Sequence, residues 1–230
     1  MSMKTIVAIV LMIIAYLIGN ISPATLLARA AGKDIKKEGS GNAGTTNVLR
    51  VLGAKAAIIT LVIDVLKGVL ATLLGFFAAY VIAKKMFDPI FTPADNYAEA
   101  VSAWCGLSVF IGHIWPILFK FKGGKGVATA LGVLLATEWK LALICLGVFA
   151  IIVVASRIVS LGSMVAAVTF LIIFVSSQVA ETSLYRIIPT IVPFVIMVGL
   201  LIFKHKENMG RIMIGEENKL SFKKNVNNIK

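Results

Sequence analysis

The sequence has few charged residues and few cysteines. Charged residues make up 15% of the 230-residue chain, whereas soluble domains carry about 25%. The two cysteines, Cys105 and Cys145, both lie in apolar stretches, so the chain offers neither a disulfide framework nor the ligand spacing of a metal site. We therefore expect small buried side chains at both positions, no bound metal and no cofactor.

The chain is instead rich in apolar residues. Hydrophobic residues make up 59% of the chain, and the mean hydropathy is +0.94. Lipid is the solvent that accepts such surface, and there only helices and closed barrels satisfy their own backbone hydrogen bonds. The apolar segments are long and lack the alternation of barrel strands. The sequence predicts an all-α integral membrane protein with a single membrane domain over residues 1–230.

Seven transmembrane helices are predicted, at about 20 apolar residues per crossing. They cover residues 4–27, 56–83, 98–119, 126–137, 139–156, 161–179 and 187–203. The fourth is short, and only Glu138-Trp139-Lys140 interrupts residues 126–156, so this region could instead be one bent helix. Ala28-Arg29-Ala30 resembles a signal cleavage site, but the basic segment that follows opposes export. We expect the first helix to be retained.

Lysine and arginine are unevenly distributed between the loops. Most of them lie on the side that the C-terminus shares, while the acidic residues divide evenly. The positive-inside rule then places the N-terminus outside and the C-terminus in the cytoplasm. The cytoplasmic face carries the whole net charge of +12, which by itself would also attract anionic lipids. Its main segments are a glycine-rich loop (28–55), a lysine/glycine turn (120–126) and a basic tail (204–230).

The glycine-rich loop contains Gly39-Ser40-Gly41-Asn42-Ala43-Gly44-Thr45-Thr46-Asn47, followed by Arg50. Glycines let successive backbone N–H groups point at one anion, and Arg50 supplies a fork for a phosphate. A dinucleotide fingerprint is excluded because no buried strand precedes the glycines. A merely flexible polar loop would not need so many glycines, hydroxyls and asparagines. The segment predicts an anion site.

The turn has the sequence Lys120-Phe121-Lys122-Gly123-Gly124-Lys125-Gly126. It is not a Walker A loop, because Gly126 stands where Ser or Thr should follow the lysine. Ordinary positive-inside flanking would explain the charge alone. Glycines on both sides of Lys125 favour close approach of a ligand.

The tail begins with Lys204-His205-Lys206-Glu207-Asn208 and continues through Arg211 to Glu217. On a helix, residues 205, 208 and 211 share one face, so a His, an Asn and an Arg would project together. His205 could accept a proton near neutral pH. The alternative is a solvated basic tail next to the membrane.

A few polar residues fall within or at the ends of the predicted helices. Asp64 and Lys67 are three positions apart and should form a buried structural ion pair, since ionised groups in lipid are costly. We interpret His113 as a packing histidine. Three residues at an inner junction could line the same site: Arg157, Ser160 and Ser163.

Together these segments resemble the bacterial membrane acyltransferases that move a fatty acyl chain from acyl phosphate to glycerol 3-phosphate. The resemblance rests on residues 40–50, on residues 112–129 from Gly112-His113 through Pro116 to Thr129, and on His205, Asn208, Arg211, Gly215 and Glu217. Thr45 departs from a frequent alanine, and Lys204 and Lys206 depart from common arginines. The resemblance implies a multi-pass protein of the bacterial cell membrane, with its site facing the cytoplasm, that makes lysophosphatidic acid in the first acylation step of phospholipid synthesis.

The resemblance also implies roles for individual residues. The catalytic set would bind glycerol 3-phosphate and set its 1-hydroxyl against the acyl carbonyl: Ser40, Arg50, Lys125, His205 and Asn208. The remaining substrate-binding residues would be Gly39, Gly41, Asn42, Gly44, Thr46, Asn47, Lys122, Gly123, Gly124, Gly126, Ser163, Arg211 and Glu217. The expected partners are glycerol 3-phosphate, acyl phosphate and membrane lipids, without nucleic acid.

The chemistry expected is direct attack on the donor. The sequence has no Ser-His-Asp arrangement and no H-x-x-x-x-D motif, which disfavours an acyl-enzyme. Either His205 or the substrate's own phosphate could accept the proton. Two other classes of membrane protein could also carry a basic cytoplasmic face. A transporter of phosphorylated metabolites would place more polar residues within its helices, and a lipid-binding scaffold would need charge alone.

Overall fold

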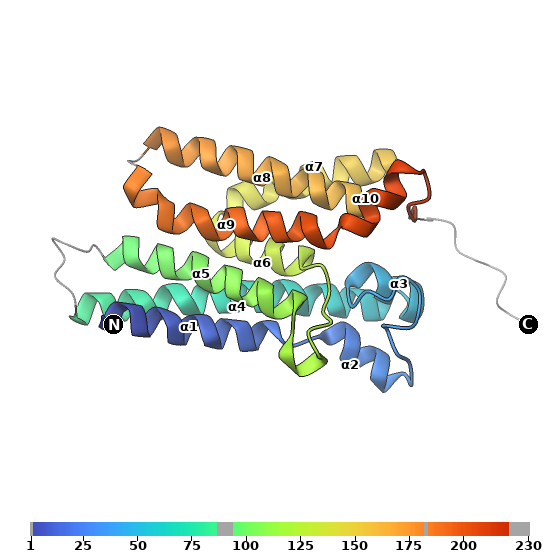
Figure 1. Cartoon of the computed structure of the whole chain (residues 1–230), viewed down its shortest axis with the longest axis horizontal. Helices are drawn as coiled ribbons and strands as arrows, with labels where there is room; N and C mark the ends of the chain where they lie inside the picture. The colour runs from blue at the N-terminus through green and yellow to red at the C-terminus, as the bar shows by residue number, and fades with distance from the viewer. Residues whose placement is uncertain (1, 87–93, 182–183, 221–230) are drawn as a thin grey trace, which may run out of the picture.

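The computed structural model describes residues 2–86, 94–181 and 184–220, and within these ranges its regular elements are all helices (Figure 1). The long helices are α1 (Met3–Gly19), α4 (Ala54–Met86), α5 (Ala94–Ile114), α7 (Trp139–Ser156), α8 (Val159–Glu181) and α9 (Leu184–Lys204). The shorter ones are α2 (Pro23–Ala30), α3 (Thr45–Leu52), the 3-10 helix η1 (Ile117–Phe119), α6 (Val127–Thr137) and α10 (Lys206–Met213). The all-α prediction is confirmed for the described residues.

The described residues contain 6 helices that are long and apolar enough to cross a membrane, with α1 and α2 taken together as Met3–Ala30. The predicted fourth span corresponds to α6, which has 11 residues. At about 1.5 Å per residue, α6 extends about 16 Å, roughly half of a hydrocarbon core of about 30 Å. Glu138 interrupts the helix between α6 and α7, so residues 126–156 form two helices, not one bent helix.

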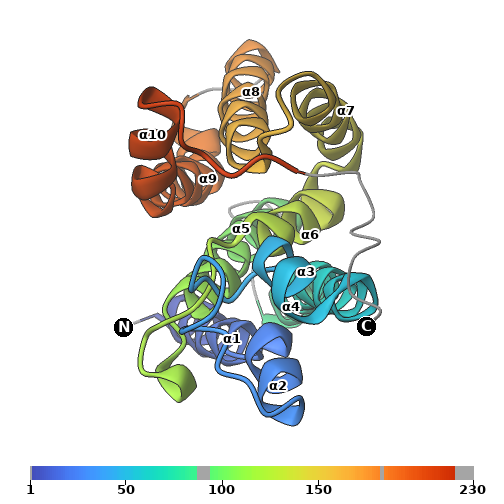
Figure 2. The same ribbon diagram turned by 90° about the vertical axis from the view of Figure 1, so that its right-hand side faces the viewer.

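The helices form two groups, α1–α6 and α7–α10 (Figure 2). Small residues allow close crossings within the first group. A Cβ on Gly19 of α1 would collide with the backbone of α5 near Gly112, and a Cβ on Gly132 of α6 would collide with the backbone of α4. In the second group, α8 and α9 interlock through Phe170, Phe174 and Phe194, whose ring centroids lie 4.9 to 5.3 Å apart.

The outer surface of both groups is apolar, as expected for a protein embedded in lipid. Large exposed side chains on the long helices include Ile58, Leu70, Phe77, Ile151, Val154 and Ile172. Their presentation outward, together with the spanning lengths of the helices, identifies a multi-pass membrane protein.

The three segments with unusual sequences lie at the same end of the bundle, opposite the N-terminus (Figure 1). The segment 28–55 is not all loop, because it contains α3 and the end of α2. A small second core of Ala28, Ile35, Ala43, Val48 and Ala57 packs this segment against the start of α4. Residues 221–230 of the predicted basic tail lie outside the described residues.

Candidate active site

A cavity of about 880 Å³ lies between the two helix groups and is lined by all three segments. Every residue predicted as catalytic lines it: Ser40, Arg50, Lys125, His205 and Asn208. Eleven of the further predicted binding residues also line it: Gly41, Asn42, Gly44, Thr46, Asn47, Lys122, Gly123, Gly126, Ser163, Arg211 and Glu217. Gly39 and Gly124 are not among the lining residues, and at both positions a side chain would collide with a neighbouring residue.

The first loop is folded around the side chain of Asn47, which is 1% exposed. Asn47 Oδ1 accepts a hydrogen bond of 2.8 Å from the Ser40 backbone N–H. Its Nδ2 donates to the carbonyls of Ile35 (3.3 Å) and Glu38 (3.0 Å). Gly39 has φ +58°, and a Cβ there would collide with Asn47 Oδ1. Asn47 and Gly39 therefore shape the loop, and Asn47 also lines the cavity.

The start of α3 contributes positive potential to the cavity. Gly44 precedes the helix and provides no side-chain cap, so the first N–H groups of α3 have no capping oxygen from that residue. Such N–H groups carry the positive end of the helix dipole and favour anions. Thr45, Thr46 and Arg50 lie on this helix and line the cavity. Backbone and guanidinium donors thus face the same space.

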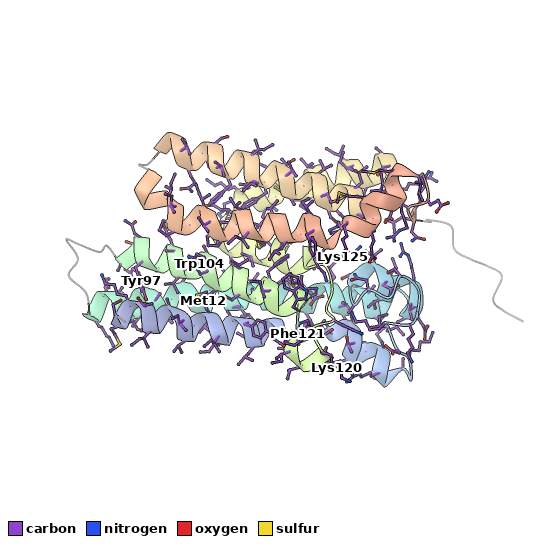
Figure 3. All side chains as sticks on the ribbon, viewed as in Figure 1. Met12, Tyr97, Trp104, Lys120, Phe121 and Lys125 are labelled. Atoms are coloured by element: carbon purple, nitrogen blue, oxygen red, sulfur yellow. The ribbon has the colours of Figure 1, made fainter. Side chains whose placement is uncertain are left out.

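The second segment, residues 120–126, is a turn that packs against the end of α5. Gly123 and Gly124 donate their N–H groups to the carbonyls of Ile114 and His113, both at 3.3 Å, and a Cβ on Gly123 would collide with the His113 carbonyl. Gly126 has φ +83° and packs against the ring of Phe110. The glycines thereby keep the backbone flat against α5 and let Lys125 project into the cavity, between the two helix groups (Figure 3).

Lys125 is held by the third segment. Its Nζ donates to Asn208 Oδ1, and burial lowers the pKa of its ammonium to about 8, against a weaker opposing effect of Glu217. Glu217 in turn accepts hydrogen bonds from Ser160 Oγ (2.9 Å), Asn208 Nδ2 (2.5 Å) and Arg211 Nε (2.8 Å). Burial opposes ionisation of Glu217, but these donors outweigh it and hold its pKa below the usual range.

This arrangement gives Glu217 a task in addition to the substrate binding that the resemblance implies. A carboxylate would repel a phosphate, whereas here it orients the amide of Asn208 and the guanidinium of Arg211. Ser163 lines the cavity, but its hydroxyl donates to the Val159 carbonyl of its own helix at 2.9 Å. The Arg157 carbonyl, at the end of α7, accepts from the Leu220 N–H at 2.7 Å and ties down the segment after α10.

His205 is 2% exposed, and its Nδ1 lies 2.8 Å from the Leu201 carbonyl. A carbonyl only accepts, so Nδ1 carries the proton and Nε2 carries the lone pair. Burial lowers the pKa of His205 to about 4, the hydrogen bond to Leu201 opposing and Lys125 reinforcing the shift. At neutral pH the imidazole is therefore uncharged and presents an acceptor.

Beyond these polar groups the cavity becomes apolar. Helices α6 to α9 line this part with Leu131, Leu134, Leu146, Phe149, Ala166, Ala167, Phe170, Met197 and Val198. The cavity therefore combines a basic mouth with an apolar interior, which suits a ligand with an anionic head and a hydrocarbon tail. No group of three or more metal-ligating side chains occurs within residues 2–86, 94–181 and 184–220.

Some lining residues were not predicted. Lys36 Nζ donates to the Gly123 carbonyl at 2.9 Å and joins the first loop to the turn; burial and Lys204 lower its pKa to about 8. No signal in the sequence separates Lys36 from the neighbouring lysines. The ion pair of Asp64 and Lys67 is confirmed at 2.7 Å. His113 joins it, and Asp64 and His113 both line the cavity, so His113 is more than a packing residue.

Comparisons with known proteins agree with this geometry. The family model described as glycerol-3-phosphate acyltransferase matches residues 9–215. The glycerol-3-phosphate acyltransferase of Thermoanaerobacter pseudethanolicus is 39% identical over 224 residues, covering 95% of this chain and 98% of the relative. That of Clostridioides difficile is 38% identical over 220 residues, covering 94% and 97%.

A solved structure is similar in fold over nearly the whole chain. It is the glycerol 3-phosphate form of PlsY (YgiH), an integral membrane glycerol 3-phosphate acyltransferase; its TM-score is 0.74 at 34% identity, and the match covers 93% of this chain and 96% of that one. Its lysophosphatidic acid form gives a TM-score of 0.72. On the family match, the relatives and the shared fold, this chain belongs to the glycerol-3-phosphate acyltransferase family, whose members act in phospholipid synthesis.

Proposed function

We propose that the protein transfers a fatty acyl group from acyl phosphate to the 1-hydroxyl of glycerol 3-phosphate, giving lysophosphatidic acid and inorganic phosphate. The observation that carries this proposal is that one cavity combines a basic mouth with an apolar interior. Both substrates bear a phosphate and one bears an acyl tail, so each part of the cavity has an occupant. The basic residues at this end of the bundle support a location on the cytoplasmic face of the bacterial cell membrane.

Glycerol 3-phosphate would bind between the two helix groups. Ser40 and Arg50 come from the first group, and His205 and Asn208 from the second. Lys125 lies between them and donates to Asn208. Cations and N–H groups converging on a small dianion are what a phosphate monoester requires. The 1-hydroxyl would then face the His205 Nε2 lone pair, which can hold it by accepting its hydrogen bond.

In the proposed reaction the 1-hydroxyl oxygen attacks the acyl carbonyl carbon, the bond from that carbon to the phosphate oxygen breaks, and inorganic phosphate leaves. The Lys125 ammonium would stabilise the charge that develops on oxygen. A phosphate with a second pKa of about 6 is a stronger base than an imidazole whose pKa is about 4. We therefore assign the hydroxyl proton to a substrate phosphate oxygen, with His205 as the group that orients the hydroxyl.

The test is a transfer assay with purified protein in detergent or lipid. Radiolabelled glycerol 3-phosphate is supplied with palmitoyl phosphate or with palmitoyl-CoA, and lysophosphatidic acid is followed. We expect product from acyl phosphate, strongly reduced in Ser40→Ala and in Lys125→Gln. Lys120→Gln is a matched control, since Lys120 lies in the same turn but is exposed and outside the cavity lining (Figure 3).

Two outcomes would contradict the proposal. Product from palmitoyl-CoA alone would overturn the choice of donor. A folded protein that binds glycerol 3-phosphate but forms no product from either donor would overturn the reaction and favour a transporter.

A further inference from the structure

A chain of buried polar contacts runs beneath the glycine turn. Lys67 Nζ lies 2.7 Å from Asp64 Oδ1, 2.7 Å from the Ile21 carbonyl and 2.8 Å from His113 Nδ1. An ammonium has three N–H donors and no lone pair. Its contacts with the Ile21 carbonyl and with His113 Nδ1 are hydrogen bonds, and its contact with Asp64 is an ion pair. Lys67 and His113 are only 3% and 7% exposed. The ammonium thereby links the break after α1 to the end of α5.

These contacts define the tautomer of His113. Two groups lie near His113 Nδ1, the Lys67 ammonium at 2.8 Å and Asp64 Oδ1 at 3.3 Å. Because the nearer group, Lys67, can only donate, we assign Nδ1 as its acceptor and place the proton of the neutral imidazole on Nε2. The other histidine has the reverse arrangement, since His205 Nδ1 donates to the Leu201 carbonyl. The two histidines of the chain therefore present opposite groups at Nε2, a donor at His113 and an acceptor at His205.

The donor at His113 faces the place where the first loop meets the turn. A Cβ on Gly124 would collide with His113 Nε2 and would lie 2.7 Å from the Ala43 carbonyl. Gly124 thus provides the room in which Nε2 lies, and His113 is one of the residues that line the cavity. The structure shows no hydrogen bond from Nε2 to any residue of the described part of the chain.

We propose that His113 is a further substrate-contacting residue, whose Nε2–H donates to a phosphate oxygen in the cavity, and that Lys67 and Asp64 are positioning residues that maintain this donor. The inference rests on the proposed function, because it requires a phosphate in the cavity. Without Lys67, the imidazole could turn a lone pair toward the anion and repel it. Glycerol 3-phosphate and acyl phosphate share the phosphate chemistry, and their Michaelis constants, measured separately, identify which of them makes the contact.

The tautomers can be observed directly in full-length protein labelled with 15N-histidine. Only two histidines contribute signals, and His205→Gln assigns them. We expect His113 to be protonated at Nε2 and His205 at Nδ1, and we expect glycerol 3-phosphate to shift the His113 Nε2–H signal. In the double variant Asp64→Asn/Lys67→Met the preference at His113 should be lost. A wild-type His113 protonated at Nδ1 would overturn the inference, whatever the variants do.

Activity provides a second readout with a matched pair of variants. In His113→Gln the side-chain amide nitrogen can reach the position of Nε2, whereas His113→Asn reaches only the position of Nδ1. We expect the Michaelis constant of the contacted substrate to rise about tenfold or more in His113→Asn, as for loss of a hydrogen bond to a charged group, with a smaller change in kcat. His113→Gln should recover most of this loss.

Equal losses in His113→Gln and His113→Asn, or no loss in either, would overturn the inference. Its failure is distinguishable from failure of the proposed function. If wild-type protein forms product, loses activity in Lys125→Gln and is insensitive at His113, only the role of His113 is wrong. If folded wild-type protein forms no product from either donor, the proposed reaction itself is wrong.

Discussion

Asn208 connects Lys125 to Glu217 through the two ends of one side-chain amide. Its Oδ1 accepts from Lys125 Nζ, and its Nδ2 donates to Glu217 Oε1 at 2.5 Å. An amide is the group that can do both, because a carboxylate cannot donate to Glu217 and an ammonium cannot accept from Lys125. The position of the central cation is therefore fixed by a residue on α10 and by a carboxylate beyond it.

Asn208→Asp should be strongly deleterious because it places two carboxylates at hydrogen-bond distance. We expect kcat/KM to fall by about 10²-fold, the size of effect seen when one preorganised donor is removed. The double variant Asn208→Asp/Glu217→Gln restores one donor and one acceptor and should recover part of the activity. A double-mutant cycle measures this coupling, expected at about 1–3 kcal/mol. Strictly additive losses would contradict the contact.

Activity should fall at alkaline pH as Lys125 loses its proton. Its pKa is about 8, so the cation is present below that pH and is lost above it. We expect kcat/KM for glycerol 3-phosphate to decline through about pH 8. In Lys125→Arg the residual activity should persist to higher pH, because guanidinium remains charged. Lys36 has a similar pKa, so Lys36→Arg is the parallel control. An alkaline limb that moves in Lys36→Arg alone would assign the decline to Lys36.

His205→Gln should lower activity without removing the acid limb of the rate profile. The pKa of His205 is about 4, so the imidazole is neutral from pH 5 upward and cannot produce a limb near pH 6. A substrate phosphate with a second pKa of about 6 can. The measurement is kcat against pH between 5 and 8 in both proteins. Disappearance of the limb in His205→Gln would show that the histidine accepts the proton.

Phe170 should limit the acyl chain. Its ring lines the apolar part of the cavity and is held by Phe174 and Phe194. Phe170→Leu opens space there, so we expect kcat/KM to shift toward longer acyl phosphates, each additional buried methylene being worth about 0.8 kcal/mol. Ile172→Leu is the control on the same helix, because Ile172 faces outward. An unchanged chain-length profile in Phe170→Leu would place the acyl tail elsewhere.

Asn47→Ala should loosen the first loop without unfolding the helices. It removes the hydrogen bonds to Ser40, Ile35 and Glu38, at a cost of about 1–3 kcal/mol. Hydrogen exchange should report faster exchange of the Ser40 amide, with α4 and α5 unchanged, and the Michaelis constant for glycerol 3-phosphate should rise. Wild-type protection at Ser40 would mean that Gly39 and the buried Ile35 suffice to hold the loop.

The sequence was sufficient to predict the helical class and most of the polar residues that face the cavity. Each motif is contiguous, and the roles of its glycines and cations can be recognised from the motif alone. It was insufficient where a role depends on side-chain direction. Asn47 and Glu217 look like ligand-binding residues in sequence, and only the structure reveals that both also hold neighbouring groups in place. Lys36 and His113 acquire their positions through contacts with segments far away in the sequence. The length of α6 was ambiguous because only Glu138 breaks the apolar run.

Because α6 is short, the acyl donor can reach the site without leaving the membrane. Since this helix has 11 residues, the lysine just before it lies among the helices and not above them (Figure 3). An acyl donor can then bring its carbonyl to Lys125 while its tail stays in hydrocarbon. Drawing a 16-carbon tail into water would cost about 12 kcal/mol at about 0.8 kcal/mol per methylene. In the proposed reaction only glycerol 3-phosphate has to enter the site from water. The product, lysophosphatidic acid, is formed with its acyl tail already in the membrane.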